Sequence, residues 1–159
     1  MKTSEFKTNV MRILDAHKTK YNHYCYADTP ALSGVDVANV LHQNPNQVFK
    51  TLVTVSRSNR YYVFMVPVCR ELDLKRAAAS VGEKAIDMLH QRDLLALTGY
   101  VHGGCSPIGM KKQFQTVADA SAHNFSTIIF SAGKIGYQVE TTPDDLAKII
   151  PLKFAEICV

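Results

Sequence analysis

A chain of 159 residues is long enough for one domain with its own buried core, and the sequence predicts a single domain over residues 1–159. Hydrophobic residues make up 47% and charged residues 20%, which is typical of a soluble globular protein, and no apolar run approaches the roughly 20 residues needed to span a bilayer. The net charge of +4 permits a nucleic-acid partner without requiring one. If RNA is the partner, the lack of a basic arm favours a protein that holds one end of the RNA over one that wraps a long duplex.

The N-terminus and the cysteines predict a cytoplasmic protein. Residues 1–7 lead directly into an amphipathic pattern and contain no apolar signal-peptide core. The four cysteines are far apart and form no CxxC pair, so we expect no disulfide framework, no metal site and no cofactor. Cys25, Cys69 and Cys158 are expected to be buried or incidental thiols. Cys105 lies in a glycine-rich loop, which leaves a functional role open.

Periodicity predicts three elements in the first third of the chain. Apolar residues at helical spacing indicate an amphipathic helix over residues 4–19. An alternating aromatic stretch indicates a strand over 21–26, and a second helix is expected over 33–42, before Asn44-Pro45 stops it.

A hairpin and two short helices follow. β-Branched and aromatic residues predict strands over 48–55 and 61–66, joined by a turn at Ser58-Asn59. Asp73 is expected to cap a helix that ends at Ser80, and a further short helix covers 90–97 before Gly99.

The last part of the chain predicts three strands and a helix. The strands are expected over 116–118, 127–130 and 136–140, with a hairpin joining the last two. Thr142-Pro143 begins a helix that ends near Ile149. Because helices and strands alternate without a regular βαβ repeat, the sequence predicts an α+β fold: a single mixed α/β domain with a curled sheet flanked by helices.

The loop over residues 100–112 is the first candidate site. Three glycines, a proline and a serine lie in this loop, and two lysines end it. Backbone N–H groups at Gly103-Gly104 can approach a ligand closely, and a run of such groups can hold an anionic or carbonyl oxygen. The loop alone favours the alternative of an ordinary connector, because these are the usual loop residues.

Lys50 is the second candidate. It lies inside a strand whose other members are apolar or threonine, and burying an ammonium group without a partner is costly. Two explanations fit this pattern equally well. Either a ligand or anion lies beside Lys50, or the strand is at a sheet edge and its lysine reaches solvent.

No protein nucleophile is evident. The six histidines have no spacing typical of a metal site or a triad, and His102 is the one that lies in the loop. Ser106 is not in a GxSxG elbow, and Cys105 would need a neighbour that stabilises its thiolate.

Two motifs in register resemble a known family. Residues 48–53 (VFKTLV) and 98–112 (TGYVHGGCSPIGMKK) closely resemble the YbaK/EbsC group of aminoacyl-tRNA deacylases, which are relatives of the editing domain inserted in bacterial prolyl-tRNA synthetase. Further matches at 72–78, 131–136 and 145–149 occur in the same order, so the resemblance covers nearly the whole chain.

The resemblance implies a curled, barrel-like mixed sheet and the removal of cysteine wrongly attached to tRNA(Pro), in trans and alongside prolyl-tRNA synthetase. Lys50 would hold the 3′-terminal adenosine of the aminoacyl-tRNA or its phosphate. The backbone of Gly103 and Gly104 would bind the aminoacyl carbonyl and the charge that develops on it. Other residues expected around the substrate are Tyr26, Phe49, Ser106 and Pro107.

In cysteine-specific members of the family, the thiol of the substrate attacks its own ester carbonyl and leaves a cyclic thioester. The protein then supplies positioning and oxyanion stabilisation, which is consistent with the missing nucleophile. Departures from the family pattern at Cys105, His102 and residues 31–35 leave two alternatives open. These are an editor of Ala- or Ser-charged tRNA, and a non-catalytic RNA-binding module of the same fold.

Overall fold

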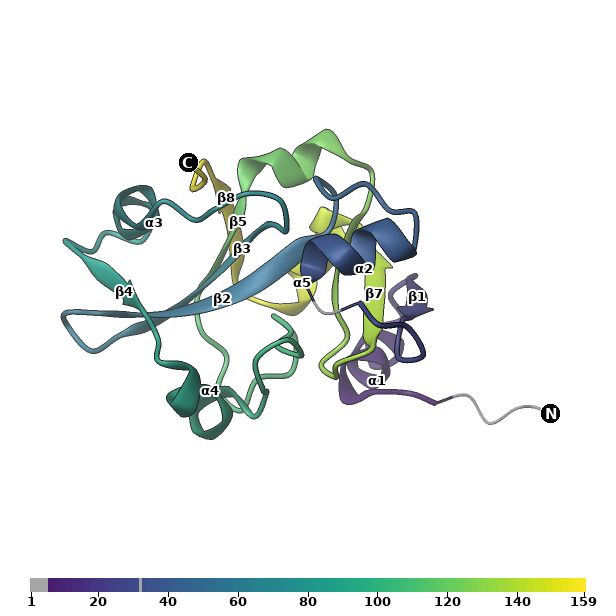
Figure 1. The fold of residues 1–159 in the computed structure, drawn as a ribbon. Helices are drawn as coiled ribbons and strands as arrows, with labels where there is room; N and C mark the ends of the chain where they lie inside the picture. Colours follow the sequence, from purple (N-terminus) through teal and green to yellow (C-terminus); the bar gives the residue numbers. More distant parts are fainter. Residues whose placement is uncertain (1–5, 32) are drawn as a thin grey trace.

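The computed structural model describes residues 6–31 and 33–159, and its strands form two sheets (Figure 1). The smaller sheet is antiparallel in the order β1-β7-β6, with β1 Asn22–Cys25, β6 Ile128–Ser131 and β7 Tyr137–Thr141. The larger sheet has the order β4-β2-β3-β5-β8, with β2 Phe49–Ser56, β3 Tyr61–Pro67, β4 Ile86–Met88, β5 Thr116–Asp119 and β8 Leu152–Ala155. β4, β2 and β3 are antiparallel, whereas β3, β5 and β8 are parallel.

Short helices cover these sheets, and most begin at a side-chain cap. They are α1 Asn9–Ala16, α2 Gly34–Val40, α3 Leu74–Ser80, α4 Gln91–Thr98, α5 Pro143–Ile149 and the 3₁₀ helix η1 Ala120–Asn124. Ser33 and Asp36 form a reciprocal capping box on α2, and the Asp73 carboxylate accepts the amides of Lys75 and Arg76 in the first turn of α3. Gly99 ends α4 with φ of 86°. Within the described residues, no helix is both long and apolar enough to cross a membrane.

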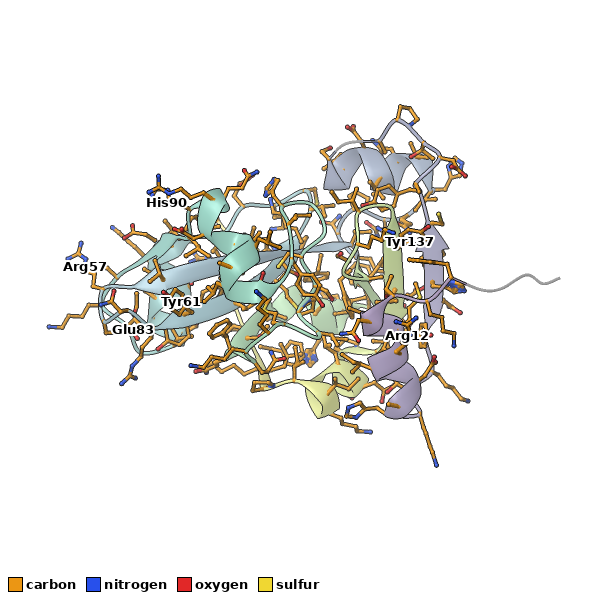
Figure 2. All side chains as sticks on the ribbon, turned by 90° about the horizontal axis from the view of Figure 1, so that it is seen from below. Arg12, Arg57, Tyr61, Glu83, His90 and Tyr137 are labelled. Carbon is orange, nitrogen blue, oxygen red and sulfur yellow. The ribbon has the colours of Figure 1, made fainter. Side chains whose placement is uncertain are left out.

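The structure confirms the predicted α+β class and the larger elements. The β2–β3 hairpin extends away from the smaller sheet, with Arg57 and Glu83 at its far end (Figure 2). The first helix is shorter than predicted, because Lys18 takes the left-handed conformation with φ of 56° directly after it. Residues 4 and 5 of that prediction, and residue 32 of the 31–35 segment, lie outside the described residues.

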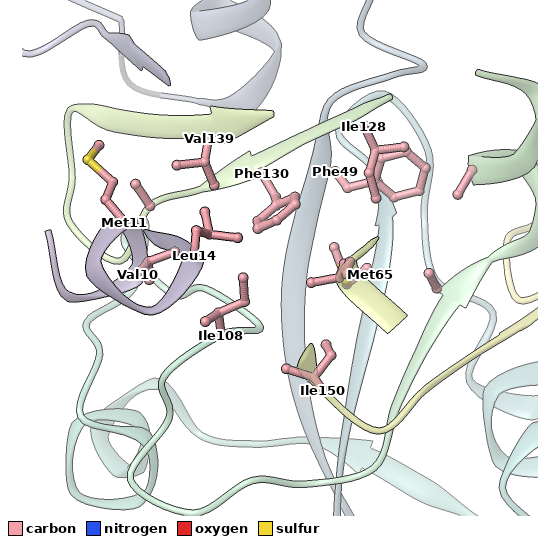
Figure 3. Packing of buried hydrophobic residues seen from close by; sticks show 14 residues of the cluster. Val10, Met11, Leu14, Phe49, Met65, Ile108, Ile128, Phe130, Val139 and Ile150 are labelled. Carbon is pink, nitrogen blue, oxygen red and sulfur yellow. The ribbon is translucent and has the colours of Figure 1, made fainter. Parts of the chain in front are cut away.

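Both faces of the larger sheet are buried, so alternate residues of β3 enter different cores. Met65 packs with Val10 and Phe130 in the core between α1, β6 and β7 (Figure 3). Phe64 and Val66 point the other way, into a core with α3. Burial on both faces explains why β3 reads as a continuous apolar run.

The two sheets meet at one edge of β2, and the strands do not close into the barrel-like sheet that we expected. Val48 forms a parallel bridge to Ile129 of β6, and β4 pairs with β2 from Thr54 onward, with one further bond from the Leu89 amide to the Val53 carbonyl. Between these two contacts, the edge of β2 around Thr51 has no neighbouring strand among the described residues. This short open edge positions the candidate site.

Candidate functional site

A cavity of about 370 Å³ lies against the open edge of β2. Successive residues from Val48 to Leu52 all line it, which shows that it borders the edge of the strand rather than one face. The other walls come from α2, the glycine-rich loop, α4 and the smaller sheet, and include Tyr26, Ser33, Gly34, Val35, Val37, Leu94, His102, Gly103, Cys105, Phe130, Ser131 and Gln138. We call this space the edge cavity.

Of the residues that the resemblance implied for the site, the structure places Lys50, Tyr26, Phe49 and Gly103 at the edge cavity. The Nζ atom of Lys50 lies 3.8 Å from Oε1 of Glu71, and its side chain is 31% exposed. Because the Glu71 side chain is 83% exposed, this ion pair holds Lys50 only weakly and leaves its ammonium group open to a ligand anion.

The two predicted backbone donors differ in their surroundings. The amide of Gly104 donates to the carbonyl of Val101 at 3.0 Å, and a Cβ at Gly104 would lie 3.1 Å from the amide nitrogen of Ile135. Gly103, with φ of 88°, lines the edge cavity, and its amide makes no hydrogen bond within residues 6–31 and 33–159. Of the pair, Gly103 therefore has the free N–H in this conformation.

Ser106 and Pro107 are buried behind the wall of the edge cavity and do not line it. The hydroxyl of Ser106 accepts the amide of Ile108 at 3.3 Å, and Tyr100 donates to the Ile108 carbonyl at 2.5 Å. These contacts hold the shape of the loop around Ser106.

Cys105 lines the edge cavity but is only 8% exposed and packs in an apolar cluster with Leu94 and Val53. Burial raises the pKa of its thiol to about 12. A thiol that stays protonated at neutral pH is a poor nucleophile, so this geometry makes Cys105 part of the wall.

Thr51 is the site residue that we did not predict. Its hydroxyl is buried at the cavity edge and has no hydrogen-bond partner among the described residues. An unpaired buried hydroxyl costs about 1–3 kcal/mol, so it is a ready contact for a bound polar group. The only sequence signal was its place beside Lys50, since threonine is ordinary in a strand.

Comparisons with known proteins show the family to which the chain is similar. The family model described as the aminoacyl-tRNA editing domain matches residues 29–149. The chain is 45% identical over 157 residues to EbsC of Enterococcus faecalis, which is named, provisionally, a Cys-tRNA(Pro)/Cys-tRNA(Cys) deacylase, and the match covers 98% of this chain and 96% of EbsC.

Solved structures share the fold at low sequence identity. One, described as a candidate trans-editing enzyme for prolyl-tRNA synthetase, has a TM-score of 0.81 and 20% identity, covering 96% of this chain and 98% of that one. Another, described only as a hypothetical protein, has a TM-score of 0.85 and 17% identity, covering 94% and 99%.

Proposed function

The chain belongs to the aminoacyl-tRNA editing domain family, and on that premise we propose that it is a deacylase that removes cysteine from mischarged tRNA(Pro). The observation that carries the proposal is that Lys50 and Gly103, from two distant motifs, line one cavity. The cytoplasm, where tRNA is charged and used, is the proposed compartment, and prolyl-tRNA synthetase is the proposed partner.

In this proposal the edge cavity receives the aminoacyl end of the tRNA. The ammonium group of Lys50 binds a phosphate or ribose oxygen of the terminal adenosine in exchange for its weak contact with Glu71. The free amide of Gly103 donates to the ester carbonyl, whose oxygen gains negative charge during the reaction. The hydroxyl of Thr51 supplies a further polar contact at the edge of β2.

The nucleophile in this mechanism is the thiol of the substrate. Its sulfur bonds to the ester carbonyl carbon, the bond from that carbon to the ribose oxygen breaks, and the thiol proton ends on the departing ribose hydroxyl. The product is a cyclic thioester that water opens to cysteine. The raised pKa of Cys105 supports this division, in which the protein positions the reacting groups and stabilises charge.

This mechanism discriminates by chemistry as well as by fit. Proline has no thiol, and the hydroxyl of serine is far less nucleophilic near neutral pH than a thiol. A correctly charged Pro-tRNA(Pro) is therefore spared even when it enters the edge cavity.

A panel of charged tRNAs tests the proposal, with loss of the ester measured under single-turnover conditions. We expect rapid loss from Cys-tRNA(Pro), and loss from Ser-, Ala- and Pro-tRNA(Pro) near the rate without protein. Preferred loss from Ala- or Ser-tRNA would reassign the substrate. Protection of Cys-tRNA(Pro) from spontaneous hydrolysis would identify a binding module instead of an enzyme.

A further inference from the structure

A second cavity, of about 290 Å³, lies beside the segment 156–159, and we call it the C-terminal cavity. Its lining carries both charge signs and neutral polar groups: Arg70, Arg76, Asp119, Ser121, Asn124 and Glu156. No part of the mechanism above uses these residues. The volume is near the lower end for ligand cavities, with room for a single nucleotide and not for a duplex.

Its arginines are only partly satisfied within the protein. Nη1 of Arg70 lies 3.6 Å from Oδ2 of Asp119, while the Arg70 side chain is 38% exposed. Nη1 of Arg76 donates to the carbonyl of Cys158 at 2.7 Å and its Nε lies 3.7 Å from Oδ2 of Asp73, while its side chain is 54% exposed. Both guanidinium groups therefore keep donors for an external phosphate or a base plane.

The acidic group deepest in the cavity does not compete for a ligand. The carboxylate of Asp119 accepts the amide of Ile157 at 3.0 Å and the amide of Ser121 at 3.1 Å, besides facing Arg70. Its charge is thus used to hold the wall. Glu156, in contrast, is exposed at the rim and free to accept a hydrogen bond.

Two neutral polar groups complete the lining. The hydroxyl of Ser121 is buried and lies beside the Asp119 carboxylate, where it helps to lower the pKa of that group without reaching ordinary hydrogen-bond geometry. The amide of Asn124 is exposed, and no hydrogen bond from it is found within residues 6–31 and 33–159. A lining with cations, an amide, a hydroxyl and a free carboxylate suits a nucleotide better than a simple anion, because a base edge offers both donors and acceptors.

The C-terminal cavity adjoins Lys50 of the edge cavity. Lys50 faces Glu71, and the carbonyl of Glu71 accepts the amide of Val159 at 3.0 Å. Arg70, the neighbour of Glu71, places Nη2 at 3.4 Å from the carbonyl of Val159. A chain of contacts through Glu71 and Val159 therefore links Lys50 of the edge cavity to Arg70 of the C-terminal cavity, although the two cavities share no lining residue.

We propose that the C-terminal cavity binds the cytidine that precedes the terminal adenosine of the tRNA 3′ CCA end. Arg70 and Arg76 bind its phosphate or stack on its base. Ser121 and Asn124 bind the base edge, and Glu156 accepts from the exocyclic amino group, as carboxylates do with cytosine. This inference rests on the proposed function, since it extends the path of the same RNA beyond Lys50.

The test compares Cys-tRNA(Pro) with 3′-O-cysteinyl-adenosine, which keeps the terminal adenosine and its ester but lacks the preceding cytidine and the rest of the tRNA. For Arg76→Gln we expect KM for Cys-tRNA(Pro) to rise about tenfold with kcat unchanged, and kcat/KM for cysteinyl-adenosine to stay the same. Loss of one phosphate contact also lowers the slope of log KM against log salt by about 0.7. Ser121→Ala, which removes a buried hydroxyl beside Asp119, should raise KM for the tRNA alone by about threefold.

Arg57→Gln is the matched control, because Arg57 is an exposed arginine at the far end of the hairpin (Figure 2). An unchanged KM for Cys-tRNA(Pro) in both cavity variants, or an equal rise for both substrates, would overturn the inference. Binding of the trinucleotide CCA, compared with binding of adenosine monophosphate, tests the C-terminal cavity independently of turnover. If wild-type protein deacylates no tRNA, the proposed function fails, while weaker CCA binding by Arg76→Gln still supports the cavity and equal binding rejects it.

Discussion

Replacing Cys105 by alanine tests whether the protein or the substrate supplies the nucleophile. With the pKa of its thiol raised to about 12, roughly one Cys105 side chain in 10⁵ is ionised at pH 7. A substrate thiol with an ordinary pKa of about 8.5 is ionised to a few per cent, roughly a thousandfold more. The mechanism therefore predicts that Cys105→Ala keeps at least about a third of the wild-type kcat.

The cost of this substitution to stability is small. Removing one buried sulfur leaves a minor cavity, so we expect the free energy of unfolding to fall by about 1 kcal/mol. The assay is single-turnover release of labelled cysteine from Cys-tRNA(Pro), with thermal unfolding of the same preparation as a control for folding.

The pH dependence of the deacylation rate distinguishes the substrate thiol from the Cys105 thiol as the nucleophile. Deacylation should rise about tenfold per pH unit through the acidic range and level off near the pKa of the substrate thiol, at about 8.5. A rate that depended on the Cys105 thiolate would continue to rise toward pH 12. A thousandfold loss of kcat in Cys105→Ala with an unchanged melting temperature would refute substrate-assisted chemistry.

Three further predictions use matched variants. Lys50→Ala should lower kcat/KM about 10- to 100-fold, because it removes one charge-assisted hydrogen bond of about 1.5–3 kcal/mol, and should change the melting temperature little. The control is Lys153→Ala, at an exposed lysine, and equal activity of the two variants would contradict a role of Lys50 in binding the substrate. Thr51→Val should lower kcat/KM about tenfold and raise the free energy of unfolding by about 1 kcal/mol, because an unpaired buried hydroxyl is removed. Kinetics and denaturant titration measure the two effects, and a lower free energy of unfolding would contradict the unpaired state of the hydroxyl. Gly109→Ala should lower the melting temperature by about 5–10 °C in calorimetry, because φ is +79° and the new Cβ would lie 2.9 Å from Oη of Tyr100. Gly82→Ala is the control, because Gly82 also has a positive φ but has open space around it. An equal fall in melting temperature in both variants would show that the contact with Tyr100 is harmless.

Much of the fold could be predicted because its signals are local. Asp73 as a cap, Gly99 as a helix end and the alternation in the β2–β3 hairpin each act within a few residues. The missed strands β4 and β8 have only three and four residues. β8 also pairs in parallel with a distant strand, so its short sequence carries no sign of its partner.

The site was predictable in part for the same reason. Lys50 and Gly103 stand out from their neighbours, and Tyr26 and Phe49 lie near them as expected. Which glycine amide stays free depends on the turn at Val101, and that turn depends on packing against Ile135 from another hairpin. The edge of β2 at Thr51 is open because antiparallel β4 ends at Met88, opposite Thr54, and the sequence carries no local signal for that end.

The open edge of β2 also bears on how the protein avoids self-association. Unpaired strand edges can recruit strands from other molecules and lead to aggregation. Here the exposed stretch around Thr51 ends at the Val48–Ile129 bridge on one side and at the start of β4 pairing on the other, so it is too short to template a foreign strand. The gap thus offers backbone groups to a small ligand while denying them to a second copy of the chain.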